Sequence, residues 1–175
     1  DKLENTDATH EWFKGFYSFY KDTNADAYTV GESYGAGAFL ATKYAEQVDH
    51  IFNFDVASGI VNSTNGESNT SINSAWVFTL KDISNGDYAT FLTNHDQNRV
   101  MSVLNGKVEK AKLAAVMLLT SPGTPFIYYG EEIGMQGKKP DEDIRLPMQW
   151  SADTNAGFTT GTPWRAPDMN YAQVN

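Results

Sequence analysis

Short apolar segments alternate with amphipathic helical segments along most of this chain, and that alternation limits the folds open to it. Apolar runs rich in strand-forming residues cover residues 27–30, 51–54, 90–92 and 126–129. Helical spacing predicts helices over residues 11–20, 36–48, 71–80 and 108–119, while the Ser-, Thr- and Asn-rich residues 62–73 predict an exposed loop. Strands that alternate with helices form parallel sheets with right-handed crossovers. We therefore predict an α/β fold with four parallel strands, in a single domain over residues 1–175.

Composition removes several classes of function. The net charge is −9 and the pI is about 4.7, which argues against nucleic acid and anionic membranes as partners. The longest apolar runs, such as residues 114–119, are too short to span a bilayer. The chain has no cysteine, and its three histidines lack metal-ligand spacing. Residues 22–33 begin like a calcium loop but have Ala27 and Ser33 where that loop needs Gly and Glu, so no metal site is predicted.

Carboxylates follow all four predicted strands. They are Glu32, Asp55, Asp96 and the pair Glu131 and Glu132. Residues just past the carboxyl ends of parallel strands face the ligand-binding side of such folds. An acidic residue there can instead stabilise the start of the next helix, and for Asp55 and the Glu131/Glu132 pair this alternative weighs equally. The neighbours of Glu32 and Asp96 favour a chemical role for these two.

Asp96 stands in a polar cluster with His95 before it and Arg99 three residues after it. Imidazole, carboxylate and guanidinium groups bind sugar hydroxyls and stabilise a developing positive charge. Glycoside hydrolysis needs two carboxyl groups, one protonated and one ionised. The sequence therefore predicts a sugar site with paired carboxylates.

Longer motifs carry a family resemblance. The sequences AYTVGE at residues 27–32 and FLTNHDQNR at residues 91–99 resemble the strand-five and strand-seven motifs of the α-amylase family, glycoside hydrolase family 13. The sequence TSPGTPFIYYGEEIGM at residues 120–135 is similar to its strand-eight segment. KPDEDIR at residues 139–145 and PMQW at residues 147–150 resemble the loop that follows. Together these matches span nearly the whole chain.

The resemblance implies roles for individual residues. Glu32 matches the general acid/base, and Asp96 matches the carboxylate that stabilises the transition state. His95 matches a substrate-binding histidine, and Asn94 and Arg99 belong to the same substrate-binding motif. The implied activity is retaining hydrolysis of α-1,4-glucosidic bonds, with an α-glucan or maltooligosaccharide as partner, by an enzyme that is secreted.

The family fold is an eight-stranded (β/α) TIM barrel whose nucleophilic Asp ends strand four, after a substrate-binding Arg. No Gly-Phe-Arg-x-Asp-like segment occurs in the 175 residues. The resemblance therefore predicts half of a TIM barrel, strands five to eight. The N-terminal half with the family's calcium site, helix eight and the C-terminal β domain are expected to lie outside it, and no cofactor is expected in this chain.

Three hypotheses follow for the polypeptide itself. The first is an isolated fragment without turnover, with Asp55 as a poorly placed substitute for the nucleophile. The second is a non-catalytic half-barrel that self-associates through its exposed strand edges and binds sugar weakly. The third is one part of a nicked enzyme whose other part supplies the nucleophile.

Overall fold

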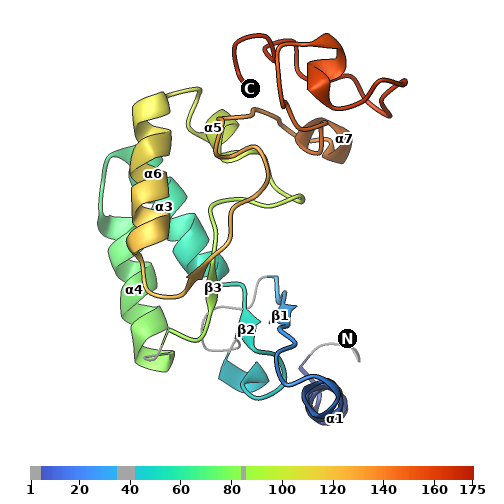
Figure 1. Cartoon of the computed structure of the whole chain (residues 1–175). Helices are drawn as coiled ribbons and strands as arrows, with labels where there is room; N and C mark the ends of the chain where they lie inside the picture. The colour runs from blue at the N-terminus through green and yellow to red at the C-terminus, as the bar shows by residue number, and fades with distance from the viewer. Residues whose placement is uncertain (1–4, 35–41, 84–85) are drawn as a thin grey trace.

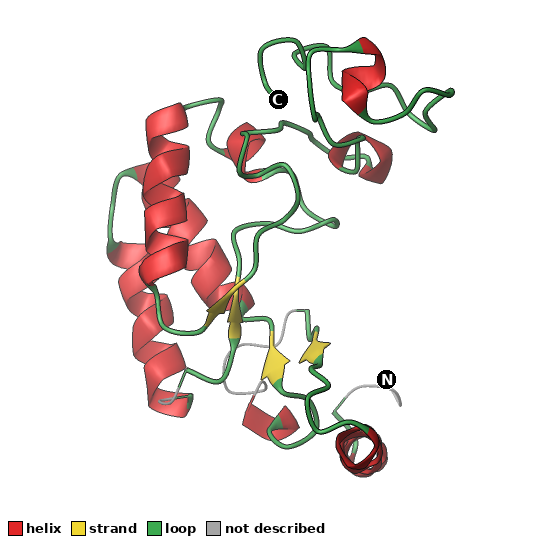
Figure 2. Ribbon diagram, viewed as in Figure 1, coloured by secondary structure: helices red, strands yellow, loops and turns green. Residues whose placement is uncertain are grey.

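The computed structural model of the chain describes residues 5–34, 42–83 and 86–175 (Figures 1 and 2). The helices and strands, in chain order, are α1 (Asp7–Thr23), β1 (Val30–Gly31), the 3-10 turn η1 (Thr42–Tyr44), β2 (His50–Ile51), α3 (Phe54–Gly66), α4 (Thr70–Asp82), β3 (Ala89–Thr90), α5 (Val100–Val103), α6 (Val108–Thr120), β4 (Thr124–Pro125), α7 (Asp141–Ile144) and the 3-10 turn η2 (Thr154–Gly157). None of the helices in these ranges has the length and apolar character needed to cross a bilayer.

The strands are short and all their pairings are parallel. β1 pairs with β2 and β3 pairs with β4, in two separate two-stranded sheets. An isolated parallel bridge between Phe52 and Ala89 lies between the two sheets, and the Asn53 amide donates to the Ala89 carbonyl at 2.9 Å. The prediction of an α/β fold with parallel pairing is confirmed. The continuous four-stranded sheet is not formed, because only one residue pair joins β2 to β3.

Helices α3, α4 and α6 lie together on one side of the strands and hold the core (Figure 1). Their buried side chains pack with residues that follow β3, among them Leu92 and Leu104. α3 supplies the middle of this layer, with Val56 and Ile60 fully buried. A Cβ at Gly59 would lie 3.0 Å from the Ala75 Cβ, so glycine permits the close approach of α3 to α4.

The predicted loop over residues 62–73 is wrong, since α3 continues to Gly66 and α4 begins at Thr70. The Asn53 side chain caps α3 by accepting from the Val56 amide at 3.0 Å. Ser63 and Thr64 are buried despite their polarity, and the Ser63 hydroxyl accepts from the Ile72 amide at 3.0 Å. The polar composition of this stretch therefore reflects the end of α3, an exposed connection at residues 67–69 and the start of α4.

Other sequence-based elements differ in extent. The predicted helices 11–20, 71–80 and 108–119 are confirmed inside α1, α4 and α6. Of the predicted helix 36–48, residues 36–41 lie outside the described residues, and 45–48 form a parallel bridge between Ala45 and Val48 instead of a helix. The strand predicted at 126–129 is displaced, since β4 is Thr124–Pro125. The predicted apolar face of α1 is exposed, with Trp12 at 64% and Phe19 at 69%.

A partly buried polar cluster joins α1 to the amino-terminal ends of β1 and β2. The Asp49 carboxylate accepts from the Thr29 amide at 2.8 Å and from the Tyr20 hydroxyl at 2.8 Å. Lys21 Nζ lies 2.6 Å from the other carboxylate oxygen. Burial alone would raise the pKa of Asp49, but the bonds from Lys21, Thr29 and Tyr20 outweigh it and lower the pKa to about 2.

Asp49→Asn is expected to lower the free energy of unfolding by about 2 kcal/mol at pH 7. The carboxylate titrates near pH 4 when unfolded and near pH 2 when folded, so its stabilisation is complete above pH 4 and is lost as the pH falls toward 2. Urea unfolding at pH 7 and pH 3 measures the difference between the two proteins, which should shrink at pH 3. An equal difference at both pH values would contradict this account.

Candidate active site

The predicted site residues leave the carboxyl ends of β1 and β3. Glu32 directly follows β1, and its side chain is exposed. Asn94, His95 and Asp96 lie in the loop between β3 and α5. Because β1 to β4 run parallel, these loops emerge on the same side of the strands.

One cavity of about 170 Å³ brings Glu32 together with Asn94 and His95. Its floor is aromatic, because Phe52 packs edge-on against Phe91 and Phe126 with ring centroids 5.2 and 4.9 Å apart. Each ring comes from a segment adjoining a different strand. Another cavity, of about 700 Å³, lies around Tyr28, Asp49 and His50 near the opposite ends of the strands and involves none of the predicted site residues.

Asp96 is not among the residues that line this cavity. It lines a neighbouring hollow of about 290 Å³ that also contains Asn62 and Lys139. The Asn94 side chain accepts from the Asp96 amide at 2.9 Å and so fixes the turn, and His95 Nε2 lies 3.4 Å from Asp96 Oδ2. The structure thus places Asp96 in contact with Asn94 and His95, and these two residues share a cavity with Glu32.

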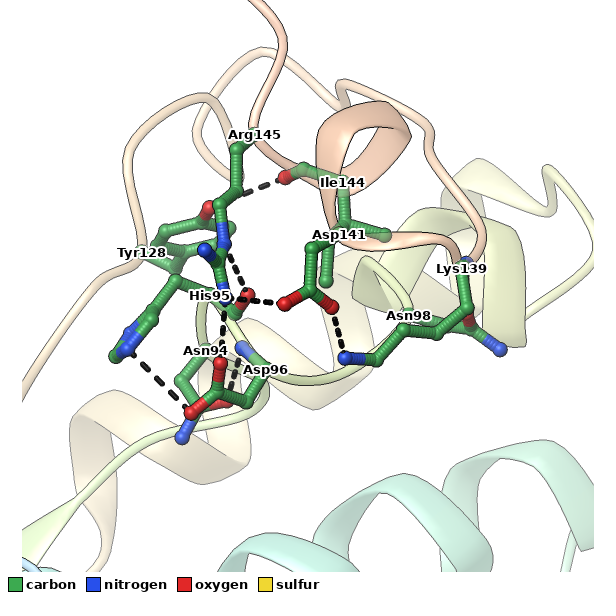
Figure 3. A network of polar contacts seen from close by, with 9 residues as sticks. All are labelled: Asn94, His95, Asp96, Asn98, Tyr128, Lys139, Asp141, Ile144 and Arg145. Carbon is green, nitrogen blue, oxygen red and sulfur yellow. Dashed lines mark hydrogen bonds and ion pairs between the residues drawn. The ribbon is translucent and has the colours of Figure 1, made fainter.

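Arg145 is the main partner of Asp96 (Figure 3). One guanidinium nitrogen donates to Asp96 at 2.6 Å and to Asp141 at 2.8 Å, and Nε donates to the His95 carbonyl at 2.8 Å. Lys139 pairs with Asp141 as well, and its hydrogen bond is the main cause of the lowered pKa of Asp141. Sequence reasoning assigned no role to Arg145 or Asp141. The available signal was the pair of opposite charges four residues apart, with Asp141 at the start of α7 and Arg145 at its C-cap.

Arg99 lies in the core with no exposed surface. Its guanidinium carbon lies 4.6 Å from the Tyr128 ring centroid and 4.5 Å from that of Tyr129. One terminal nitrogen donates to the Tyr129 carbonyl at 2.7 Å, whereas Nε and the other terminal nitrogen have no hydrogen-bond partner among the residues described. The side chain therefore supports the loop after β4, and no part of it reaches solvent.

Glu131 forms a cross-link between the loops that follow β3 and β4. Its carboxylate accepts from the Thr93 hydroxyl at 2.8 Å and from the Tyr128 amide at 3.3 Å. Burial raises the pKa of Glu131 to about 7, although these hydrogen bonds and the charge of Arg99 act in the opposite direction. Sequence reasoning could not separate Glu131 from Glu132, because only burial distinguishes them.

The Glu131 carboxyl is expected to make the protein less stable as the pH rises from about 4.5 to 7. The folded state keeps the proton in that window while the unfolded chain loses it, so the free energy of unfolding falls by about 3 kcal/mol from this group. Urea unfolding across pH 4.5–7.5 measures the slope in the native chain and in Glu131→Gln. The variant should lack this part of the slope, and equal slopes in the two proteins would refute the assignment.

The remaining acidic candidate, Asp55, lies in the first turn of α3, where a negative charge favours the helix. Among the residues that the structure describes, no group of three or more His, Asp and Glu side chains is arranged to hold a metal ion. The chemistry available at this end of the strands therefore comes from exposed carboxylates, an imidazole and a guanidinium.

Known proteins are similar to this chain in both fold and sequence. Alpha-amylase 3 of Dictyoglomus thermophilum is 40% identical over 164 residues, which cover 91% of this chain and 32% of that protein. An oligo-1,6-glucosidase of Heyndrickxia coagulans is 31% identical, over 86% of this chain and 37% of that protein. Among solved structures, Eubacterium rectale Amy13B superposes with a TM-score of 0.78 at 34% identity, over 94% of this chain and 34% of that one.

The chain thus spans about a third of the length of these curated relatives. An alpha-amylase from H. orenii has a TM-score of 0.76 at 32% identity over 97% of this chain, so the fold corresponds to part of a TIM-barrel catalytic domain. The family model described as "Alpha amylase, catalytic domain" matches residues 1–175. The chain belongs to the α-amylase catalytic-domain family of glycoside hydrolases, family 13.

Proposed function

We propose that this chain carries the acid/base half of an active site that hydrolyses α-1,4-glucosidic bonds in starch or maltooligosaccharides with retention of configuration. The observation that supports this best is that Glu32, Asn94 and His95 line one shared cavity at the carboxyl ends of parallel strands. The named activities of the relatives, α-amylase and oligo-1,6-glucosidase, agree with a glucosidic substrate.

Glu32 acts as the general acid and then as the general base. Its exposed carboxyl group protonates the glycosidic oxygen as the bond to the leaving sugar breaks, and later removes a proton from the attacking water. The aromatic floor formed by Phe52, Phe91 and Phe126 offers an apolar surface to the sugar ring above it.

Asp96 stabilises the positive charge that develops on the ring during cleavage. In the structure described, its carboxylate is paired with Arg145 and lies beside His95. Both partners are partly exposed. Breaking the ion pair so that Asp96 can accept from sugar hydroxyls therefore costs about 1 kcal/mol or less. His95 donates to substrate hydroxyls, Asn94 holds the turn, and Arg99 is a positioning residue because it is buried.

Retaining hydrolysis also needs a nucleophilic carboxylate about 5 Å from the acid. Asp55 is not among the residues that line the cavity of Glu32, and the chain covers about a third of its relatives. We therefore propose that the 175-residue polypeptide alone has no turnover. The complete activity requires the part of the barrel that the relatives possess in addition.

A second candidate is a non-catalytic half-barrel that self-associates. It is favoured by the exposure of both residues of β4 and of Trp12 and Phe19 on α1. Light scattering tests this candidate, because a measured mass equal to that of one chain at all concentrations would exclude self-association.

The catalytic proposal is tested with a chromogenic maltoheptaoside. The isolated chain should release no chromophore. A chimaera in which this chain replaces the matching segment of the Dictyoglomus α-amylase should hydrolyse the substrate, and NMR should show the α-anomer as the first product. Turnover by the isolated chain would overturn the proposed inactivity. A folded but inactive chimaera would overturn the assignment of an α-amylase-type site.

A further inference from the structure

Thr93 lies between the two hollows that hold the candidate site residues. It lines the cavity of Glu32 and also the neighbouring hollow that contains Asp96. Its side chain is buried, and it directly precedes the turn over residues 94–99, which carries Asn94, His95 and Asp96. A displacement of Thr93 would therefore move the start of this turn.

One hydrogen bond closes the base of the turn. The Thr93 hydroxyl accepts from the Val100 amide at 3.2 Å. These two residues directly precede and follow residues 94–99, and Val100 is the first residue of α5. The bond between them therefore sets how far apart the two ends of the turn lie.

Glu131 sets the direction of the Thr93 hydroxyl. A hydroxyl group has one proton to donate and two lone pairs that accept. The Thr93 hydroxyl donates its proton to Glu131 Oε1 at 2.8 Å, and its lone pairs then face the Val100 amide. Without the Glu131 carboxyl, the Thr93 side chain would lose one of its two hydrogen bonds and would be free to take another rotamer.

The second oxygen of the same carboxyl binds another part of the cavity wall. Glu131 Oε2 accepts from the Tyr128 amide at 3.3 Å, and Tyr128 lines the cavity. The Tyr128 hydroxyl donates to the Ile144 carbonyl at 3.0 Å (Figure 3). The next residue, Arg145, pairs with Asp96. One carboxyl group thus connects the loop after β3 with the loop after β4, and through Tyr128 with α7.

A carboxyl group is an unfavourable choice for filling space at this position. Burial raises the pKa of Glu131 to about 7, which means that the surroundings disfavour its charged form. An apolar side chain would fill the same volume without that penalty, but it would bind neither Thr93 nor Tyr128. What Glu131 adds is therefore the fixed geometry of these two segments.

We propose that Glu131 is a positioning residue for the candidate active site. Through Thr93 it holds the turn that carries Asp96, and through Tyr128 it holds the loop after β4. The inference rests on the proposed function, in which Asp96 stabilises the transition state. Glu131 is not among the residues that line the cavity of Glu32, so it acts through its two partners and not on the substrate.

The first measurement is hydrogen exchange at the Val100 amide of the 175-residue chain, followed by NMR. Glu131→Ala should raise this exchange rate about tenfold more than that of the α6 amides, which report global unfolding. Glu131→Gln should raise it by no more than about twofold, because the amide oxygen still accepts from Thr93. Glu142→Gln is the control: Glu142 is an exposed carboxyl on α7, and its loss should leave the rate unchanged.

The second measurement is turnover by the Dictyoglomus chimaera at a temperature where every variant is folded. Glu131→Ala should lower kcat about tenfold to hundredfold with a smaller change in KM, because the transition state is more sensitive than substrate binding to the position of Asp96. Glu131→Gln should lower kcat by no more than about threefold. Thr93→Val removes the hydroxyl at nearly constant size, and added to Glu131→Ala it should cause little further loss, because both changes break the same link.

The outcomes separate this inference from the proposed function. An unchanged Val100 exchange rate in Glu131→Ala overturns the inference, and so does faster exchange combined with a native kcat, while the proposed function stands in both cases. Defects that multiply in the double variant with Thr93→Val would show independent roles and would also contradict the inference. A folded but inactive native chimaera, with exchange as expected, overturns the proposed function and the catalytic consequence of Glu131 together.

Discussion

Arg99→Ala is expected to lower the free energy of unfolding by about 3–5 kcal/mol. The substitution removes a long, fully buried side chain and leaves a void between Tyr128 and Tyr129. It also removes the hydrogen bond to the Tyr129 carbonyl and the positive charge next to Glu131. Urea unfolding at pH 7 measures the loss.

Arg99→Lys is the control that retains the charge. Lysine lacks the planar guanidinium that stacks on the two tyrosine rings, so a loss of about 1–2 kcal/mol is expected. A midpoint for Arg99→Ala equal to that of the native chain would show that the buried guanidinium does not stabilise the loop after β4.

In the Dictyoglomus chimaera, Glu32→Gln is expected to reduce turnover of the maltoheptaoside by about 10²–10⁴-fold. Glutamine has nearly the shape of glutamate but cannot give a proton to the leaving oxygen. Because the side chain is exposed, the substitution should leave the unfolding midpoint unchanged. Steady-state kinetics should therefore show a lower kcat with a nearly constant KM.

One further substrate and one further variant of the chimaera test this assignment. A substrate with an activated leaving group needs less protonation, so the defect of Glu32→Gln should shrink with such a substrate. Asp55→Asn should keep the native rate, since Asp55 is in the first turn of α3 and not in the cavity of Glu32. A native rate for Glu32→Gln would remove Glu32 from the mechanism.

Helices with strong apolar spacing were predictable from the sequence in both place and extent, whereas the short strands were predictable in approximate place but not in extent. α4 and α6 combine suitable length with regular spacing, so their positions were predicted to within two residues. α3 was missed because Ser63 and Thr64 resemble loop residues, although the Asn53 cap and the apolar residues at positions 56, 57, 60 and 61 carried a helical signal. Each β-strand is two residues long, and pairings that short leave too few residues for a pattern.

The candidate site was predictable in its motifs but not in its contacts. The sequence placed Glu32 and Asp96 after strands, and both lie there. It gave no sign that Arg99 is buried between two tyrosines, because arginine is a residue usually found at the surface. Nor could it show that Arg145 reaches Asp96, since 49 residues separate them and only the fold brings them together.

In the ion pair between Arg145 and Asp96, the Arg145 side chain competes with any ligand for the Asp96 carboxylate. A ligand that must contact Asp96 can bind only those protein molecules in which the Asp96 carboxylate is not paired with Arg145. The measured dissociation constant therefore exceeds the intrinsic one by the reciprocal of that free fraction. For an exposed pair this factor is roughly twofold to fivefold. Changes at residue 145 would thus alter the affinity for any ligand of Asp96 by changing the fraction of molecules in which this carboxylate is free.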